Sequence, residues 1–113
     1  MTSETPTAIE RFLKAEDDGD AQALASCFRP EGVVLDEGQT HIGRREIVSW
    51  RRAAASAYNY TATVTAAERL GRDAHRIVKH LEGDFPGGVA DLDYLFALKE
   101  DQIAALMIFQ QKG

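Results

Sequence analysis

Polar and apolar positions follow two different periods along the chain. Up to about residue 57, apolar side chains recur three and four positions apart, which is the spacing of one helix face. Proline, glycine and aspartate divide this part into segments. The spacing predicts three helices: from Pro6, with Thr5 as N-cap, to a stop at Gly19; from a cap at Asp20 to the break at residues 30–32; and from Arg44 to about Ala57.

Beyond residue 57 the pattern becomes an alternation of apolar and polar side chains, which is typical of strands. A short strand, Val33–Leu35, also precedes the third helix and ends in a turn at residues 36–38. Turns near residues 71–73, 86–88 and 99–101 separate four longer strands, predicted over Tyr58–Leu70, Ala74–Phe85, Val89–Leu98 and Gln102–Gln110. Helices first and a meander afterwards predict an α+β fold with a single domain over residues 1–113.

Composition and charge exclude several classes of function. The net charge is −5, which disfavours nucleic acid or an anionic membrane as a partner, since both attract a basic surface. The beginning of the sequence lacks the basic and apolar regions of a signal peptide, and no apolar run has membrane-spanning length. One cysteine, Cys27, cannot form an internal disulfide. We therefore expect a cytoplasmic protein that binds neither nucleic acid nor membrane.

The segment from Gly32 to Gly43 carries the first candidates for chemistry. Asp36 stands where the apolar strand ends, and a carboxylate partly shielded from water there can act as a general base. The alternative is that Asp36 only forms a turn with the amides that follow it. His41 could relay a proton to or from Asp36, although a loop histidine is more often simply exposed.

Asp93 is the second candidate acid, because a strand interior disfavours aspartate. Alternation places Asp91 and Asp93 on one face of their strand, with Tyr94 and Phe96 on the other. Either the acidic face lines a cavity or, as in an ordinary sheet, the acids face solvent and the aromatic side chains form the core.

The other chemically interesting side chains have equally plain structural explanations. Trp50 lies on the apolar stripe of the third helix, where it either packs in the core or stacks on a ligand. His80 either faces a cavity or lies in the core or at the surface. Asp36, His41 and His80 could form a set of two histidines and one carboxylate, but no local ligand spacing supports it, and we predict no metal. Four arginines of the third helix are typical of a solvated face, and the alternative is a clamp for an anionic ligand: Arg44, Arg45, Arg51 and Arg52.

Matching segments in a characteristic order relate the chain to a known group of proteins. They are Arg11–Leu13, Gly19-Asp20, Phe28, Val33–Asp36, Gly43–Ile47, Phe85–Gly88 and Asp93. With these segments the chain resembles the SnoaL-like branch of the nuclear transport factor 2 superfamily, which also contains ketosteroid isomerase, scytalone dehydratase and the polyketide cyclases. The resemblance implies a cone-shaped α+β barrel, with three N-terminal helices packed on a curved antiparallel sheet, and often a homodimer through the outer sheet face.

The resemblance also assigns roles to individual residues. Asp36 falls at the position of the catalytic base of ketosteroid isomerase, and Asp93 at that of a protonated acid that stabilises an oxyanion. It therefore favours Asp93 inside the cone, with Tyr94 and Phe96 on the dimerising face. Phe12 replaces a tyrosine that donates to the oxyanion, and losing such a donor costs about two to three orders of magnitude in rate. Steroid isomerisation is therefore not expected.

These observations lead to one main hypothesis and one alternative. We expect a cofactor-independent acid/base enzyme, of the isomerase, cyclase, dehydratase or hydrolase type, that acts on an apolar small molecule with a carbonyl group. Asp36, Asp93 and His41 are the candidate catalytic residues, and the ligand pocket is expected to involve Phe12, Phe28, Trp50, Tyr60 and His80. The alternative is a non-catalytic ligand-binding or protein-interaction module that dimerises on the same scaffold.

Overall fold

A computed structural model describes residues 5–111 of the chain. Its helices are α1 (Thr7–Asp18), α2 (Ala21–Ser26) and α3 (Arg44–Ala57). Its strands are β1 (Phe28–Asp36), β2 (Gln39–Ile42), β3 (Tyr60–Arg69), β4 (Ala74–Gly83), β5 (Val89–Lys99) and β6 (Gln102–Gln110). The six strands form one sheet in the order β2-β1-β6-β5-β4-β3. The sheet is mixed, because β1 runs parallel to β6 while every other neighbouring pair is antiparallel.

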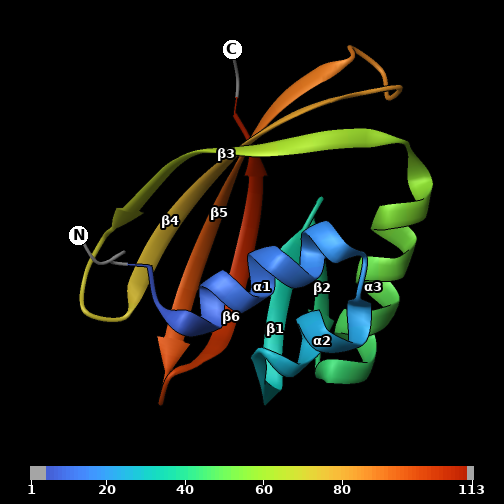
Figure 1. Cartoon of the computed structure of the whole chain (residues 1–113). Coiled ribbons are helices and arrows are strands. Elements are labelled where there is room, and N and C mark those ends of the chain that lie inside the picture. Colours follow the sequence, from blue (N-terminus) through green and yellow to red (C-terminus); the bar gives the residue numbers. More distant parts are fainter. Residues whose placement is uncertain (1–4, 112–113) are drawn as a thin grey trace.

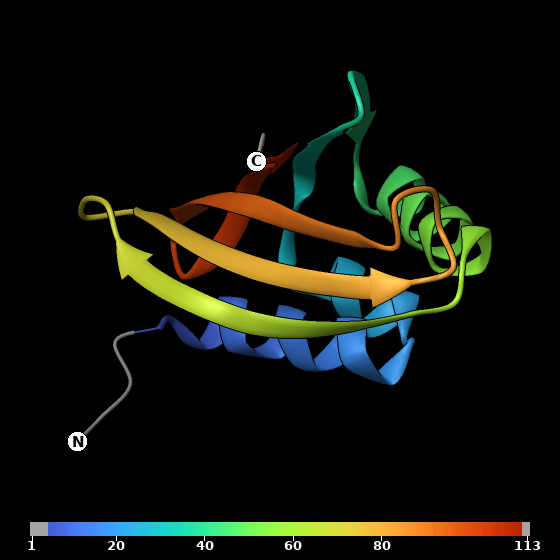
Figure 2. The same cartoon turned by 90° about the horizontal axis from the view of Figure 1, so that it is seen from above.

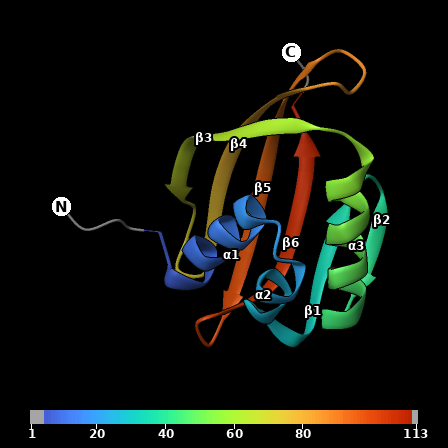
Figure 3. The same ribbon diagram turned by 45° about the vertical axis from the view of Figure 1, so that its right-hand side comes forward.

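The sheet is strongly curved and does not close into a barrel. All three helices lie on its concave side, and α3 stands beside β1 and β2 (Figure 1). Seen from above, the long strands β3, β4 and β5 arch over α1 (Figure 2). Turned by 45°, the molecule shows α1 and α3 as the two walls of a cone whose back is the sheet (Figure 3). The predicted α+β cone is confirmed, with a mixed rather than a purely antiparallel sheet.

The turn between α1 and α2 has clear local causes. Gly19 ends α1 with φ of 71°, a left-handed conformation that glycine adopts without steric cost. The side chain of Asp20 then accepts a hydrogen bond from the Ala23 amide at 3.0 Å and caps α2. The other predicted cap is wrong by one residue, since α1 begins at Thr7 and Pro6 occupies the N-cap position.

Strand β2 differs from the sequence prediction, which has a turn at residues 36–38 and a loop from there to the third helix. Glu37 and Gly38 both have positive φ, 53° and 75°, and this pair forms the two-residue hairpin turn that joins β1 to β2. The hairpin places His41 opposite Val34 and Gln39 opposite Asp36. Asp36 and His41 therefore share the concave face with Val34, which is fully buried.

The core lies between the helices and the concave face of the sheet. Phe12 of α1 is completely buried and makes edge contacts with Phe28, Tyr94 and Phe96 at centroid distances of 6.0, 6.2 and 5.2 Å. These rings fill the space between α1 and the sheet. Among the described residues, no helix has the length and the apolar character that crossing a membrane requires.

Candidate functional site

Asp36 lies at the end of β1, partly buried beneath α3. Its Oδ2 accepts a hydrogen bond from the indole Nε1–H of Trp50 at 2.9 Å. Its other oxygen, Oδ1, accepts no hydrogen bond from any side chain or amide of residues 5–111. Asp36 is thus fixed through one oxygen and has a second oxygen available for a proton.

His41 comes to the same place from β2. Its ring centre lies 6.2 Å from that of Trp50, and the two planes are inclined by 36°. The indole therefore contacts both side chains for which the sequence suggested proton chemistry. Trp50 is itself buried in the core, so the structural reading of its apolar position is confirmed, and it also positions Asp36.

A second polar group lies deeper in the cone. We call it the buried ionic cluster and define it as Glu16, Arg51, Tyr60, Lys79 and Tyr94. Glu16 accepts hydrogen bonds on Oε2 from Arg51 Nη1 at 3.2 Å and from the Tyr94 hydroxyl at 2.9 Å, and on Oε1 from Lys79 Nζ. Arg51 Nη2 also donates to the Tyr60 hydroxyl at 2.8 Å. The cluster joins α1 and α3 to strands β3, β4 and β5.

The buried ionic cluster has a surplus of positive charge. Burial, together with the carboxylate of Glu16, raises the pKa of Tyr94 well above its ordinary value, so this hydroxyl stays neutral. Burial lowers the pKa of Arg51, but the neighbouring Glu16 and Tyr60 outweigh it and the pKa rises. Two cations therefore face one carboxylate, and the interior of the cone favours negative charge.

The sequence contains signals for this cluster in the positions of its charged residues. Glu16 follows Phe12 by four residues on the apolar stripe of α1, and Arg51 follows Ile47 by four on that of α3. The prediction that Arg51 belongs to a solvated face is therefore wrong, since only 7% of it is exposed. Lys79 likewise follows Ile77 by two residues and shares the inward face of β4 with it. A charged residue at a position that the apolar periodicity assigns to the core thus indicates a buried ionic cluster.

The predicted orientation of Asp93 is wrong. Tyr94 and Phe96 point inward and pack on Phe12, so Asp93 lies on the convex face of the sheet. There its Oδ1 accepts hydrogen bonds from Arg76 Nε at 2.8 Å and from Gln111 Nε2 at 3.0 Å. The sheet follows the ordinary rule that the apolar face is covered by helices. Because Asp93 lies outside the cone, it cannot act as the acid or oxyanion donor that an inward position suggested.

The expectation that His80 faces the pocket is also wrong. Its Nδ1 lies 2.8 Å from Asp91 Oδ1 and its Nε2 lies 2.9 Å from Glu82 Oε2, on the convex face. Asp36 and His41 lie on the concave face, so the three cannot share a metal ion. Within residues 5–111, no group of three or more acidic, histidine or cysteine side chains has the arrangement of a metal site.

The hydrogen bonds of His80 predict how it titrates. Bonds to Asp91 and then to Glu82 raise the pKa of His80 above its ordinary 6.5. A raised pKa means that this stabilisation is complete below pH 6.5 and is lost as the pH rises through the folded-state value. We expect Asp91→Asn to return the pKa toward 6.5 in an NMR titration of the imidazole, whereas Glu37→Gln leaves it raised. A wild-type His80 that titrates at or below 6.5 contradicts the geometry.

The predicted pocket residues have different surroundings. Phe12 and Phe28 are completely buried, so they are core residues rather than the wall of an open space, and that prediction is wrong. Tyr60 is half-buried and reaches the buried ionic cluster through its hydroxyl. The structure thus brings Asp36, His41 and Trp50 together, adds Tyr60 to the cluster and separates Asp93 and His80 from both.

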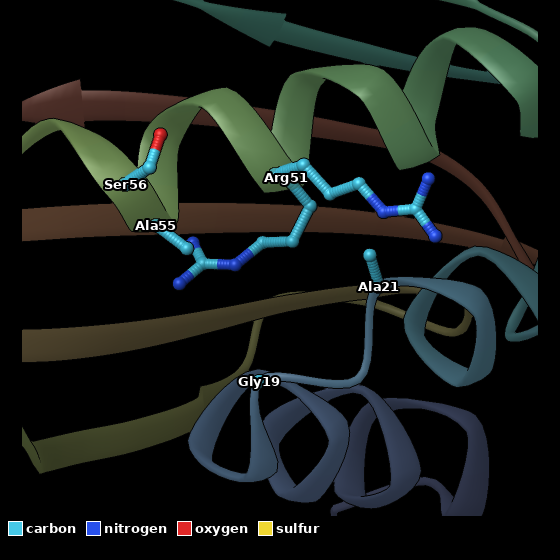
Figure 4. Close-up of a pocket in the computed structure, with 6 residues that line it drawn as sticks. Gly19, Ala21, Arg51, Ala55 and Ser56 are labelled. Carbon is cyan, nitrogen blue, oxygen red and sulfur yellow. The ribbon is translucent and has the colours of Figure 1, made fainter.

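An open pocket of about 230 Å³ lies beside the cluster (Figure 4). It separates α3 from the link between α1 and α2. Its lining residues are Gly19, Ala21, Arg51, Arg52, Ala55 and Ser56. None of the five residues predicted to form the ligand pocket lines it, whereas two of the arginines considered as an anion clamp, Arg51 and Arg52, do.

Comparison with solved structures places the molecule among relatives of known fold. A candidate polyketide cyclase from Sinorhizobium meliloti has 32% sequence identity, with 94% of this chain and 96% of that chain covered and a TM-score of 0.87. A hypothetical protein with a ketosteroid isomerase-like fold from Catenulispora acidiphila, solved with trimethylamine, has 23% identity, coverage of 93% and 85%, and a TM-score of 0.80.

A candidate ketosteroid isomerase from Kribbella flavida shares the architecture at 8% identity, with 96% and 78% of the chains covered and a TM-score of 0.79. The likeness to it and to the Catenulispora protein shows the fold alone. No protein-family model and no curated protein matches the sequence.

Proposed function

We propose, since the chain belongs to the SnoaL-like branch of the nuclear transport factor 2 superfamily, that it catalyses cofactor-independent acid/base chemistry on an apolar small molecule with a carbonyl group. Asp36 is the proton acceptor and His41 an auxiliary proton carrier. The observation that carries the proposal is the Asp36 carboxylate, held through Oδ2 by the Trp50 indole with Oδ1 left for a substrate proton. The 32% identity to a candidate polyketide cyclase supports carbonyl chemistry in particular.

The reaction step needs only a proton transfer. Asp36 Oδ1 takes a proton from the carbon next to the carbonyl; the electron pair of that C–H bond forms a C=C bond, and the π pair of the carbonyl moves onto its oxygen to give an enolate. The surplus positive charge of Arg51 and Lys79 favours an anion in the cone. Returning the proton from Asp36 to a different carbon of a conjugated enolate gives isomerisation. Attack of the enolate on a second carbonyl forms a C–C bond and an alkoxide, which takes the proton back from Asp36 and completes cyclisation.

Hydrogen exchange into ketones tests this proposal without knowledge of the natural substrate. An enolising protein in D₂O replaces the α-hydrogens of a ketone with deuterium, which NMR follows directly. We expect exchange above the buffer rate with at least one member of a panel of cyclic and aryl ketones. Asp36→Asn, which keeps the shape of the side chain, should slow it about 100-fold to 10,000-fold, as the loss of a general base does.

Asp93→Asn is the matched control, because Asp93 lies on the convex face, and it should keep the wild-type exchange rate. A folded Asp36→Asn variant that exchanges at the wild-type rate contradicts the assignment of the base. If no ketone of the panel exchanges, the enolising activity is wrong and the second candidate function remains.

That second candidate is a non-catalytic ligand-binding module that works as a homodimer. Exposed apolar side chains on the convex face of the sheet support it. An apolar strip crosses this face over β1, β2, β5 and β6, with Leu35, Ile42, Leu95, Met107 and Phe109. Ile42, Met107 and Phe109 are 57%, 38% and 44% exposed. A second copy that packs on this strip would remove the apolar side chains from water.

Charge placed on the strip tests the dimer. We expect sedimentation to show a wild-type dimer and a monomer for Phe109→Glu, because the carboxylate would be buried without a partner. Leu70 is 52% exposed, comparable to Phe109, and lies away from the strip, so Leu70→Glu should leave the dimer intact. A monomeric wild-type protein, or a dimer that survives Phe109→Glu, contradicts this interface.

A further inference from the structure

The pocket between α3 and the α1–α2 link is lined by a cation, Arg52, that the acid/base proposal does not use. Its volume of about 230 Å³ suits a small organic molecule rather than an extended one. Two of its lining residues, Arg51 and Arg52, are consecutive arginines on α3. The other lining residues are small (Figure 4).

Arg51 is an incompletely satisfied cation at the inner wall of this pocket. Only 7% of the residue is exposed, and its two terminal nitrogens donate to Glu16 and Tyr60. Its Nε is a buried nitrogen without an acceptor among the described residues. Buried donors are almost always paired in native proteins, so an unpaired guanidinium nitrogen beside a pocket indicates a missing acceptor.

Arg52 supplies a second positive charge at the outer wall. It is exposed and makes no ion pair with another residue in the described part of the chain. Asp20 is close in sequence to the lining residues Gly19 and Ala21, but its Oδ1 is engaged with the Ala23 amide as the cap of α2. Inside the cone, Glu16 is shared between Arg51 and Lys79. Among the described residues, the charge of Arg52 therefore has no carboxylate partner, and that of Arg51 has only a shared one.

We propose that this pocket binds a small organic anion, a compound that joins a carboxylate to a compact apolar group. The carboxylate contacts the exposed guanidinium of Arg52, and the charge of Arg51 at the inner wall adds to the attraction. A planar guanidinium matches the geometry of a carboxylate. The methyl groups of Ala21 and Ala55 contact the apolar part. The proposal does not depend on the chemistry of Asp36 and holds equally for a non-catalytic protein.

Benzoate is a suitable probe, and benzamide is its neutral counterpart of the same shape. We expect benzoate to shift the backbone amide signals of Gly19, Ala21 and Ala55 in a saturable way in ¹⁵N–¹H NMR spectra. Benzamide should bind at least tenfold more weakly. Arg52→Gln, an exposed change that leaves the buried ionic cluster intact, should weaken benzoate binding about tenfold or more. Arg45→Gln removes an exposed arginine of the same helix outside the pocket and should change nothing.

Three results would overturn the proposal. One is equal binding of benzoate and benzamide, because the carboxylate would then contribute nothing. Another is unchanged benzoate affinity in Arg52→Gln. The third is inorganic phosphate displacing benzoate at equal concentration, because the pocket would then attract any anion and would not recognise an organic carboxylate. None of these outcomes depends on the hydrogen exchange that Asp36 is proposed to catalyse, so the two proposals fail separately.

Discussion

Glu16→Leu should lower the free energy of unfolding by about 3–5 kcal/mol, because it leaves two buried cations without their shared carboxylate. Glu16 and Lys79 have side chains only 4% and 3% exposed, and that of Arg51 is 8% exposed, so water cannot replace the lost partner. The Tyr94 hydroxyl also loses its acceptor. A loss of this size is a large part of the 5–15 kcal/mol that is usual for a domain.

Urea unfolding of matched variants measures this effect. Asp18→Asn removes the carboxylate of an exposed ion pair with Lys14 on the same helix and should cost no more than about 0.5 kcal/mol. Lys79→Met combined with Glu16→Leu should cost less than the sum of the two single changes, because it removes a cation together with its carboxylate. A loss below about 1 kcal/mol for Glu16→Leu contradicts the buried ionic cluster.

Phe12→Ala should also cost about 3–5 kcal/mol of unfolding free energy. Phe12 is completely buried, and three aromatic rings surround it, so the change leaves a cavity that the packed core cannot close. Phe109→Ala is the comparison, because Phe109 is 44% exposed and should lose far less. If Phe12→Ala costs under about 1.5 kcal/mol, Phe12 lines an open space, as the sequence suggested.

Most of the fold could be predicted from local signals. The α3 boundaries, Arg44–Ala57, and those of β6, Gln102–Gln110, agree with the prediction. A change of hydrophobic period marks the end of α3, and a turn at residues 99–101 precedes β6. Strand β2 was missed because its alternation is only four residues long and its turn has a glutamate at positive φ. The parallel pairing of β1 with β6 joins distant segments, and no local pattern encodes it.

The candidate site was predicted less well, and the reason is geometric. Asp36 and His41 could be chosen as candidates because a strand end and a turn mark them. The hydrogen bond from Trp50 to Asp36 and the ring contact of Trp50 with His41 join separate elements, and no local pattern indicates them. Asp93 was misplaced because alternation defines two faces without saying which is inside. The inward position of Tyr94 is decided by its contacts with Glu16 and Phe12, which are distant in the sequence. Arg51 was predicted to be solvent-exposed because arginine is charged, although its position on the apolar stripe of α3 indicates burial.

The indole signal of Trp50 gives the most direct test of Asp36 as the reacting group. The sequence has one tryptophan, so ¹⁵N–¹H NMR shows one indole N–H signal, and that proton is bonded to Asp36 Oδ2. A ketone whose α-hydrogens exchange in the presence of the protein should shift this signal until the shift saturates. The shift and the exchange rate should reach half of their maximum at the same ketone concentration. Exchange that saturates while the indole signal stays in place would contradict the assignment and put the chemistry elsewhere in the cone.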